Sequence, residues 1–200
     1  MKPQIDEIER IKIFYLILED RRYFCHNGFD IISVTRAILK SFFGYRICAI
    51  STIEQQLVRT KNNHKERTFS RKLREISHAI EHANRFSKEQ NLCEYLDTAY
   101  FGWNIKGINQ LTEKINARNF GCPEKLTASW YASMLLYPMP RHPNKFWTEK
   151  VYHRAKYGFE MRDRIRHTVS FGPWSIGFSG SRPIIVSTEL RRRILSLDKS

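Results

Sequence analysis

Apolar residues recur at helical spacing through residues 68–84, and this pattern limits the possible folds more than any other feature of the chain. The apolar positions lie three or four residues apart, at Phe69, Leu73, Ile76, Ile80 and Ala83. That spacing aligns their side chains along one face of an α-helix. The segment is therefore predicted to be an amphipathic helix.

Further periodic segments and helix-start signals extend the helical pattern. Apolar residues over 8–17 repeat at roughly helical spacing and place Glu19 at the C-terminal end of a first helix. The segments 51–54 (STIE) and 87–90 (SKEQ) have the form of a capping box, in which a Ser side chain and a Glu or Gln three residues later bond to free N–H groups at a helix start. Two more helices are expected to begin there.

The last third of the chain adds two helices and then changes pattern. Thr127 is expected to cap a helix that the three prolines of 138–143 stop, and a further helix is predicted at 146–166. From 168 to 187 the residues alternate and are rich in Gly, Ser and Pro, which indicates a hairpin or loose strands. The sequence therefore predicts a mainly α protein with a short hairpin-like appendage.

The chain is strongly basic, with 34 Lys and Arg residues against 20 Asp and Glu and a formal charge of +14. Some face must carry a positive potential that attracts phosphates or an anionic membrane. Seven cations cluster at Arg59, Lys61, Lys65, Arg67, Arg71, Lys72 and Arg74. No zinc-finger spacing or strand of RNA-recognition type accompanies them, so a phosphate-binding groove is expected and only charge favours nucleic acid.

Missing motifs exclude several classes of protein. The four cysteines, at 25, 48, 93 and 122, form no C-x-x-C pair, so neither a zinc ribbon nor a dense disulfide scaffold is encoded. The chain has no G-x-S-x-G elbow, no S-x-x-K with a downstream K-T-G, and no Gly-rich phosphate loop. No apolar run reaches the ~18–20 residues that cross a bilayer, and the first ten residues lack the pattern of a signal peptide.

The polar stripe of the 68–84 helix has two interpretations. Arg71, Glu75, His78 and His82 fall on this stripe. The simpler interpretation is a solvated face with a weak Arg71–Glu75 pair. The same stretch contains HAIEH (78–82), which matches the H-x-x-E-H pattern of a zinc protease, with two His ligands and a Glu base. The sequence assigns no third ligand.

Five segments in order resemble the peptidoglycan glycosyltransferases, the transglycosylase domains of penicillin-binding proteins (glycosyltransferase family 51). They are EDRRYFCHNGFD (19–30), STIEQQLVRT (51–60), RTFSRKLREISHAIE (67–81), CEYLDTAYFG (93–102) and LTASWYASMLLYPMPRHPNKF (126–146). Their order and intervals fit the family across 10–146. The chain looks like a divergent member, because it departs from the usual family residues at Ala49, Arg59, Asp97 and Trp130. A monofunctional enzyme is expected, since 200 residues leave no room for a transpeptidase domain.

The resemblance implies a lysozyme-like, mainly α transglycosylase fold with a small jaw subdomain that dips into the membrane. It implies a transglycosylase-like domain over 1–167, with the jaw at about 31–66. The Gly/Ser-rich appendage at 168–200 has no counterpart in the family. The apolar and aromatic stretch 41–50 (SFFGYRICAI) is the candidate membrane contact of the jaw, with a buried connector as an equal alternative.

The resemblance also implies the reaction. Family members polymerise lipid II into glycan strands by inverting glycosyl transfer, in which a sugar hydroxyl of the acceptor attacks the anomeric carbon of the growing chain. Undecaprenyl pyrophosphate is the leaving group. Such a step requires a general base at the acceptor and positive charge at the leaving group. Glu19 matches the catalytic base of the family, and Glu75 matches its second glutamate.

Substrate-binding residues are implied in the same way. Asp20 supports the first site, and His26 with Gly28 shapes the turn that holds it. The other matching positions are Ser51, Gln55, Gln56, Arg59, Arg67, Arg71 and Lys72. Arginine suits a pyrophosphate because it stays charged and can fork onto two oxygens. Mg²⁺ or Mn²⁺ is implied as a cofactor, but no ligand set can be assigned from the sequence.

The implied substrates are lipid II and the nascent glycan chain, with an anionic membrane surface and other cell-wall synthesis proteins as partners. Family habit places such an enzyme on the periplasmic or outer face of the bacterial cytoplasmic membrane, in peptidoglycan and cell wall biogenesis. A second hypothesis keeps the fold but makes the protein a catalytically weak or regulatory binder of lipid-linked precursors. A basic helical nucleic-acid-binding protein is the third hypothesis, and a zinc protease the last.

Overall fold

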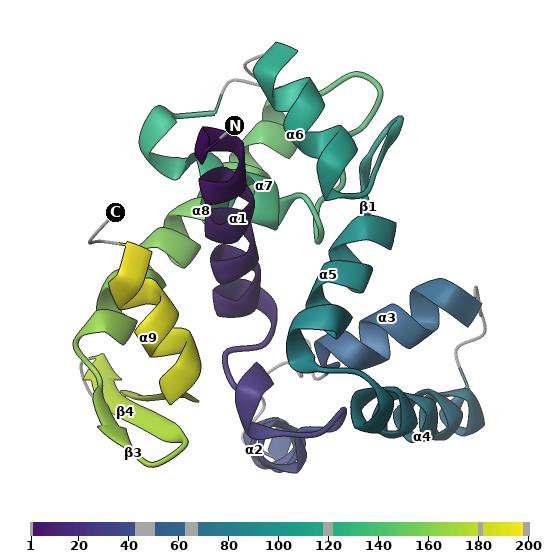
Figure 1. Cartoon of the computed structure of the whole chain (residues 1–200), viewed down its shortest axis with the longest axis vertical. Helices are drawn as coiled ribbons and strands as arrows, with labels where there is room; N and C mark the ends of the chain where they lie inside the picture. Colours follow the sequence, from purple (N-terminus) through teal and green to yellow (C-terminus); the bar gives the residue numbers. More distant parts are fainter. Residues whose placement is uncertain (1, 43–50, 63–67, 118–121, 180–181, 198–200) are drawn as a thin grey trace. The chain divides into compact units, whose positions relative to one another are not determined.

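The computed structural model describes residues 2–42, 51–62, 68–117, 122–179 and 182–197 (Figure 1). Within these ranges the chain is mainly helical, which confirms the predicted fold class. None of the helices in these ranges is long and apolar enough to cross a bilayer. The chain divides into two compact units, which we call unit 1 (1–21 and 96–200) and unit 2 (22–95). The boundary proposed after residue 167 stays a prediction.

Unit 1 is built around α1 (Lys2–Glu19), which packs against α7 (Thr127–Ser133) and α8 (Lys145–Arg166). The fully buried side chains of α1 include Ile11, Tyr15, Leu16 and Ile17. Helices α7 and α8 approach closely because Gly158 has no side chain: a Cβ there would lie 2.6 Å from Ser129 Oγ. The Ser129 hydroxyl donates to the Ala155 carbonyl at 2.7 Å, so its polar group is satisfied within this contact.

A hairpin of β1 (Tyr100–Gly102) and β2 (Ile105–Lys106) precedes α6 (Ile108–Ala117). A short 3₁₀-helix, η2 (Glu124–Leu126), then leads into α7. Thr127 does not cap this helix as expected. It already has helical backbone angles, and its hydroxyl donates to the Glu124 carbonyl at 2.7 Å. An N-cap residue has non-helical backbone angles. Thr127 follows η2 directly and already has helical angles, so it cannot be the N-cap.

The C-terminal strands form a three-stranded antiparallel sheet, of β3 (Val169–Phe171), β4 (Trp174–Ser179) and β5 (Arg182–Ser187) in that order. The strands predicted for 168–187 are therefore confirmed, and they form three strands where a hairpin has two. The sheet is followed by α9 (Thr188–Leu197), which packs against β4 and β5 (Figure 1). Helix α9 carries the basic run 191–193.

Unit 2 contains η1 (Tyr23–Cys25), α2 (Ile31–Phe42), α3 (Ile53–Asn62), α4 (Phe69–Arg85) and α5 (Lys88–Thr98), the last residues of which belong to unit 1. Helix α3 packs against α4. The capping box at the start of α5 is confirmed: Ser87 N donates to Gln90 Oε1 at 2.8 Å, and Gln90 N donates to Ser87 Oγ at 3.2 Å.

The capping box predicted at Ser51 is wrong by one residue. Helix α3 begins at Ile53, and Thr52 Oγ1 accepts from Gln55 N at 3.3 Å, so Thr52 is the capping residue. The same hydroxyl donates to the Gly28 carbonyl at 2.8 Å. Thr52 is thereby fixed by two bonds, and the Ser51 hydroxyl is available for another partner.

Candidate active site

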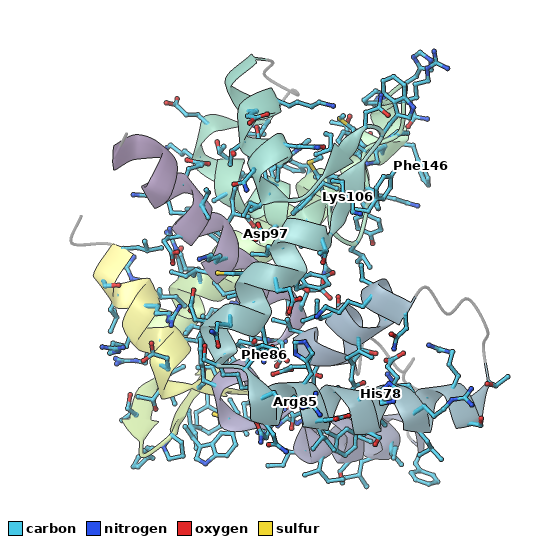
Figure 2. The ribbon with its side chains drawn as sticks, turned by 45° about the vertical axis from the view of Figure 1, so that its right-hand side comes forward. His78, Arg85, Phe86, Asp97, Lys106 and Phe146 are labelled. Atoms are coloured by element: carbon cyan, nitrogen blue, oxygen red, sulfur yellow. The ribbon has the colours of Figure 1, made fainter. Side chains whose placement is uncertain are left out.

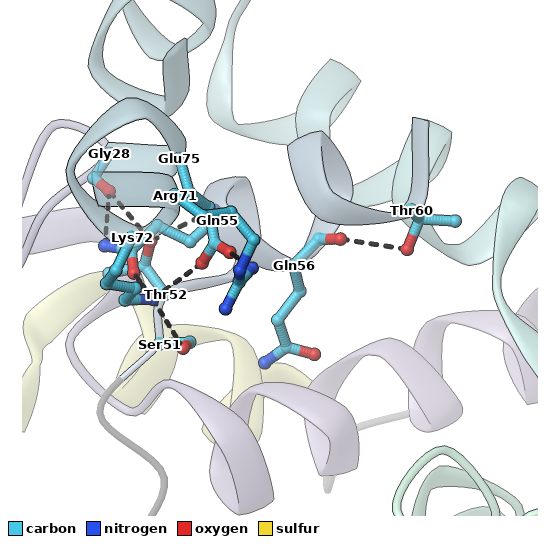
Figure 3. Close-up of polar contacts among 9 residues, drawn as sticks. All are labelled: Gly28, Ser51, Thr52, Gln55, Gln56, Thr60, Arg71, Lys72 and Glu75. Atoms are coloured by element: carbon cyan, nitrogen blue, oxygen red, sulfur yellow. Dashed lines mark hydrogen bonds and ion pairs between the residues drawn. The ribbon is translucent and has the colours of Figure 1, made fainter. Parts of the chain in front are cut away.

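Glu75 lies at the centre of a polar network inside unit 2 (Figure 3). Its side chain is only 4% exposed, and its two carboxylate oxygens face two cations of the same helix. Lys72 Nζ lies 2.6 Å from Oε1, and Arg71 Nη1 lies 2.7 Å from Oε2. These cations come three and four residues before Glu75, so one helical turn places them beside it. The charge of the buried carboxylate is thus compensated locally.

Lys72 links α4 to the start of α3 (Figure 3). Besides Glu75, its ammonium group donates to Gln55 Oε1 at 2.6 Å and to Ser51 Oγ at 3.0 Å. These three bonds use every N–H donor that a lysine has. Five of the predicted site residues are therefore brought together in one network: Ser51, Gln55, Arg71, Lys72 and Glu75.

Gly28 brings the preceding loop against this network. Its φ of +78° favours glycine, and a Cβ at this position would lie 2.5 Å from the Ala79 carbonyl oxygen of α4. Its own carbonyl accepts from Thr52 and from Gln55 Nε2, the latter at 3.2 Å. Thr52 and Gln55, at the start of α3, thus hold the loop around Gly28 in place. Gly28 shapes the turn of this loop, which also carries His26.

The buried side of α4 is not the apolar stripe that predicts the helix. Leu73 and Ile80 are exposed, whereas Glu75 and Ala79 are buried. The interpretation of the polar stripe as a solvated face is therefore wrong for Glu75. A carboxylate can lie on the inner side of this helix because Arg71 and Lys72 compensate its charge.

A small hollow beside this network collects further cations. Its volume is about 30 Å³, and it is lined by Val58, Arg59, Asn62, Arg71, Arg74, Glu75 and His78. Arg59 and Arg74 are exposed, whereas Arg71 Nε is buried and has no hydrogen-bond partner within the described part of the chain. Planar guanidinium groups with donors available suit an oxyanion. Arg67 lies outside the described residues, so its place here stays a prediction.

Gln56 does not join the Lys72 network (Figure 3). Its side-chain oxygen accepts from the Tyr95 hydroxyl at 3.0 Å, and its backbone oxygen accepts from the Thr60 hydroxyl at 2.9 Å. These bonds connect α3 to α5 and stabilise α3 itself. The structure thus gives Gln56 a supporting position in unit 2.

Glu19 ends α1 in unit 1 and pairs with Arg154 of α8. Its side chain is 9% exposed. The same guanidinium group donates to the Leu18 carbonyl at 3.4 Å, so Arg154 spans the C-terminal end of α1, where a cation is favourable to the helix dipole. The sequence analysis missed Arg154, because the pair joins positions 135 residues apart and no local spacing reveals it.

A wider hollow lies beside Arg154 in unit 1. Its volume is about 490 Å³, and it is lined by Tyr137, Phe146, Glu149, Lys150, His153, Arg154 and Tyr157. Lys150 Nζ lies 4.1 Å from the centroid of the exposed Phe146 ring, which is labelled in Figure 2. The hollow therefore combines ring faces with hydrogen-bond donors, a mixture that suits a polar ligand with apolar faces.

Asp20 and His26 occupy different units. Asp20 is buried at the end of unit 1's first segment, where its backbone N–H donates to the Leu16 carbonyl at 3.0 Å. The His26 ring lies in unit 2, edge-on to Tyr23 with ring centroids 6.1 Å apart. Their roles in the first site stay predictions.

Asp30 organises the start of α2, and the sequence analysis did not select it. Its Oδ2 accepts from Arg22 Nε at 2.8 Å, and its Oδ1 accepts from the backbone N–H groups of Ile32 and Ser33 at 3.1 Å each. Burial acts to raise the pKa of Asp30, but hydrogen bonds from Ser33 and Arg22, with the charge of Arg22, hold it below its ordinary value. An Asp just before a helical segment is a common N-cap signal that could have revealed it.

The HAIEH stretch does not form a zinc site. Both ring nitrogens of His82 have partners: Nδ1 lies 2.7 Å from Asn91 Oδ1, and Nε2 lies 3.0 Å from Lys61 Nζ. His78 is exposed on α4 (Figure 2), and no possible metal-binding group within the described ranges includes either histidine. The zinc-protease hypothesis is therefore wrong.

The implied Mg²⁺ or Mn²⁺ prefers oxygen donors, and Glu75 and Asp30 are two of the buried carboxylates of unit 2. Both oxygens of Glu75 already accept from cations. Asp30 accepts from Arg22 and from the helix start. Glu75 therefore does not fit a metal in this arrangement, and the metal requirement stays a prediction.

Comparison with known proteins places these residues in a family. The chain matches the family described as Transglycosylase over residues 4–166. It is 35% identical to the monofunctional glycosyltransferase of Staphylococcus epidermidis over 94 residues, which are 47% of this chain and 35% of that protein. It is 34% identical to penicillin-binding protein 4 of Bacillus subtilis over 106 residues, 52% of this chain and 17% of that protein.

The aligned part thus spans about a third or less of these relatives' length. The family match covers well over half of the chain, and it contains Glu19, Glu75 and every predicted substrate-binding residue. This chain therefore belongs to the transglycosylase family.

Proposed function

We propose that this protein is a peptidoglycan glycosyltransferase that polymerises lipid II into glycan strands by inverting glycosyl transfer. The main support is the transglycosylase match over residues 4–166, because this range holds both candidate carboxylates and the cations around them. In the proposed step, the acceptor hydroxyl oxygen forms a bond to the anomeric carbon of the growing chain. The bond from that carbon to undecaprenyl pyrophosphate breaks, and the hydroxyl proton passes to Glu19.

Glu19 acts as the general base in this proposal. Arg154 is a positioning residue: its guanidinium group contacts both the Glu19 carboxylate and the Leu18 carbonyl, so it holds the carboxylate in one orientation at the end of α1. A base fixed in this way needs little reorganisation when the acceptor arrives.

The leaving pyrophosphate is assigned to the guanidinium groups of Arg59, Arg71 and Arg74. These line one hollow, and Arg71 Nε has no partner within the described part of the chain. The three N–H donors of Lys72 are already used, so Lys72 supports the site mainly by fixing Glu75, Gln55 and Ser51. Glu75 in turn orients Arg71 through its second oxygen. The hollow beside Arg154, with its aromatic rings, is assigned to the glycan chain.

The enzyme is proposed to work on the outer face of the bacterial cytoplasmic membrane, where lipid-linked substrates would be available. Helix α2 supports contact with an anionic membrane surface, because it exposes several large apolar side chains, at Ile31, Ile32, Ile38, Leu39 and Phe42. The candidate membrane contact at 41–50 lies outside the described residues from position 43 onward.

The decisive experiment incubates the purified protein with lipid II and Mg²⁺ and separates the glycan products on a gel. Glu19→Gln should produce essentially no polymer, since an amide cannot accept the proton. The matched control is Glu160→Gln, an exposed carboxylate on α8, which should polymerise as the wild type does.

Polymer from Glu19→Gln would remove Glu19 from its role. If the wild-type protein binds lipid II but forms no polymer, the second hypothesis would be favoured instead, in which the protein is a binder of lipid-linked precursors.

A further inference from the structure

Trp103 lies at the tip of the β1–β2 hairpin in unit 1, with much of its side chain in solvent. The residue is 45% exposed, although tryptophan is highly buried on average. Trp103 and Asn104 form the two-residue turn between the strands. Asn104 has a φ of +56°, a left-handed conformation that asparagine tolerates. The hairpin therefore presents a large aromatic ring at a tight turn.

The backbone that carries Trp103 is fixed by the segment 138–144, which leads into α8. Trp103 N donates to the Met139 carbonyl at 2.7 Å, and Met139 N donates to the Phe101 carbonyl at 2.9 Å. Gly102 makes this approach possible, because a Cβ there would lie 2.5 Å from Met139 N. A ring on such a fixed backbone loses little conformational entropy when it binds a ligand.

The same segment places Arg141 over the Trp103 ring. Arg141 Cζ lies 5.1 Å from the ring centroid, within the range of a cation–π contact. Within the described ranges of the chain, the Arg141 guanidinium makes no hydrogen bond or ion pair, and the Trp103 indole N–H makes no hydrogen bond. We call these two side chains the Trp103–Arg141 pair. It combines an aromatic ring with N–H donors that a ligand could use.

A sugar ring suits this combination of groups. Its faces carry C–H groups, which pack against the electron-rich face of an aromatic ring. Its oxygen substituents lie around the edge, where guanidinium and indole N–H groups can donate to them. A bilayer fits less well, because membrane binding scales with the apolar area buried, and the pair offers one indole beside a cation.

The segment 138–144 also connects the pair to the hollow beside Arg154. Tyr137 precedes this segment and Phe146 follows it, and both residues line that hollow. Tyr137 and Arg141 are four residues apart in the sequence. Their Cα atoms are therefore separated by at most about 14 Å, a distance that a chain of several sugar rings can span. The pair lies where a glycan strand longer than the hollow could continue.

We propose that the Trp103–Arg141 pair is an outer subsite for the glycan strand. The indole packs against the face of one sugar ring, and the guanidinium group donates to the oxygen substituents of that ring. The inference rests on the proposed function, because the glycan chain is the ligand assigned to the hollow beside Arg154. A second point of contact on the same strand strengthens the binding of long strands.

The test measures binding of a soluble, uncrosslinked octasaccharide cut from peptidoglycan glycan strands, by titration calorimetry with the full chain and without lipid II. Trp103→Ala should raise the dissociation constant at least fivefold. Trp103→Tyr should recover part of the affinity, because it keeps a ring. The matched control is Phe178→Ala, an exposed aromatic residue on β4, which should bind within twofold of the wild type. Thermal unfolding checks that all variants fold.

Equal octasaccharide affinity of Trp103→Ala and the wild type would overturn the proposal. So would a wild-type protein that polymerises lipid II but binds no octasaccharide. The same proteins are sedimented with phosphatidylglycerol vesicles: if Trp103→Ala loses only vesicle binding, a bilayer is the occupant and the subsite is refuted. If the wild type forms no polymer but Trp103→Ala still weakens octasaccharide binding, the subsite stands and the proposed transfer reaction falls.

Discussion

The two candidate catalytic carboxylates are held in opposite ways. Glu75 faces two cations of its own helix, three and four positions earlier in the chain. Glu19 faces an arginine from a helix 135 positions later. The first arrangement arises when α4 forms, whereas the second requires α1 and α8 to pack together. Secondary structure therefore fixes one carboxylate, and tertiary packing fixes the other.

Asp30 in unit 2 is also held by residues close to it in the sequence. Its loss should cause the largest decrease in the free energy of unfolding among the changes considered. Asp30→Asn removes the carboxylate that pairs with the buried Arg22, which should lower the free energy of unfolding at pH 7 by about 3–4 kcal/mol. The pKa of Asp30 is lowered in the folded state, so its stabilisation is present above the unfolded value near 3.8 and is lost as the pH falls through the folded value.

Urea unfolding of the wild type and of Asp30→Asn, measured between pH 7 and pH 3, checks both points. The gap between the two proteins should narrow below about pH 4, because the Asp30 carboxyl takes up its proton first in the unfolded chain and only at lower pH in the folded protein. A gap that stays constant down to pH 3 would show that the charge of Asp30 is not what stabilises this region.

The distant partner of Glu19 should matter for rate. Arg154→Met should lower kcat roughly a hundredfold with little change in KM, because a general base displaced by about 1 Å loses that much. Arg154→Lys should recover part of the rate, since a cation can still reach the carboxylate. The matched control is Lys156→Met, an exposed cation on the same helix. A kcat within twofold of the wild type for Arg154→Met would show that Glu19 needs no positioning.

The smallest expected effects come from removing the charge of Glu75 or of Glu19, and they compare the two carboxylates directly. Glu75→Gln should reduce the free energy of unfolding by about 2 kcal/mol, because Arg71 and Lys72 would then face a neutral amide and repel each other. Glu19→Gln should cost about 1 kcal/mol, since the partly exposed Arg154 loses its partner. Urea unfolding of both variants gives the two values. Equal losses would contradict the view that Glu75 has the stronger local compensation.

Local patterns predicted helices α1, α3, α4, α5, α7 and α8, because three-to-four spacing and capping residues act within a few positions, but they did not predict α2 and α6. The limits of α4, the box at Ser87 and the strands after residue 168 follow from such signals. The buried side of α4 did not follow, since Leu73 and Glu75 exchange their expected environments once two cations compensate the carboxylate. The candidate site shows the same limit: Lys72 and Glu75 are neighbours on one helix, but Arg154 meets Glu19 only through packing.

The contact at Gly28 has a consequence for how unit 2 tolerates change. Backbone meets backbone there, with Ala79 on the opposite side. No rotation of a side chain can make room for even a methyl group, so an alanine would have to push the loop that carries His26 away from α4. Variation in this loop is therefore confined to its other positions, and sequence drift at residue 28 should be the rarest of all in this part of the protein.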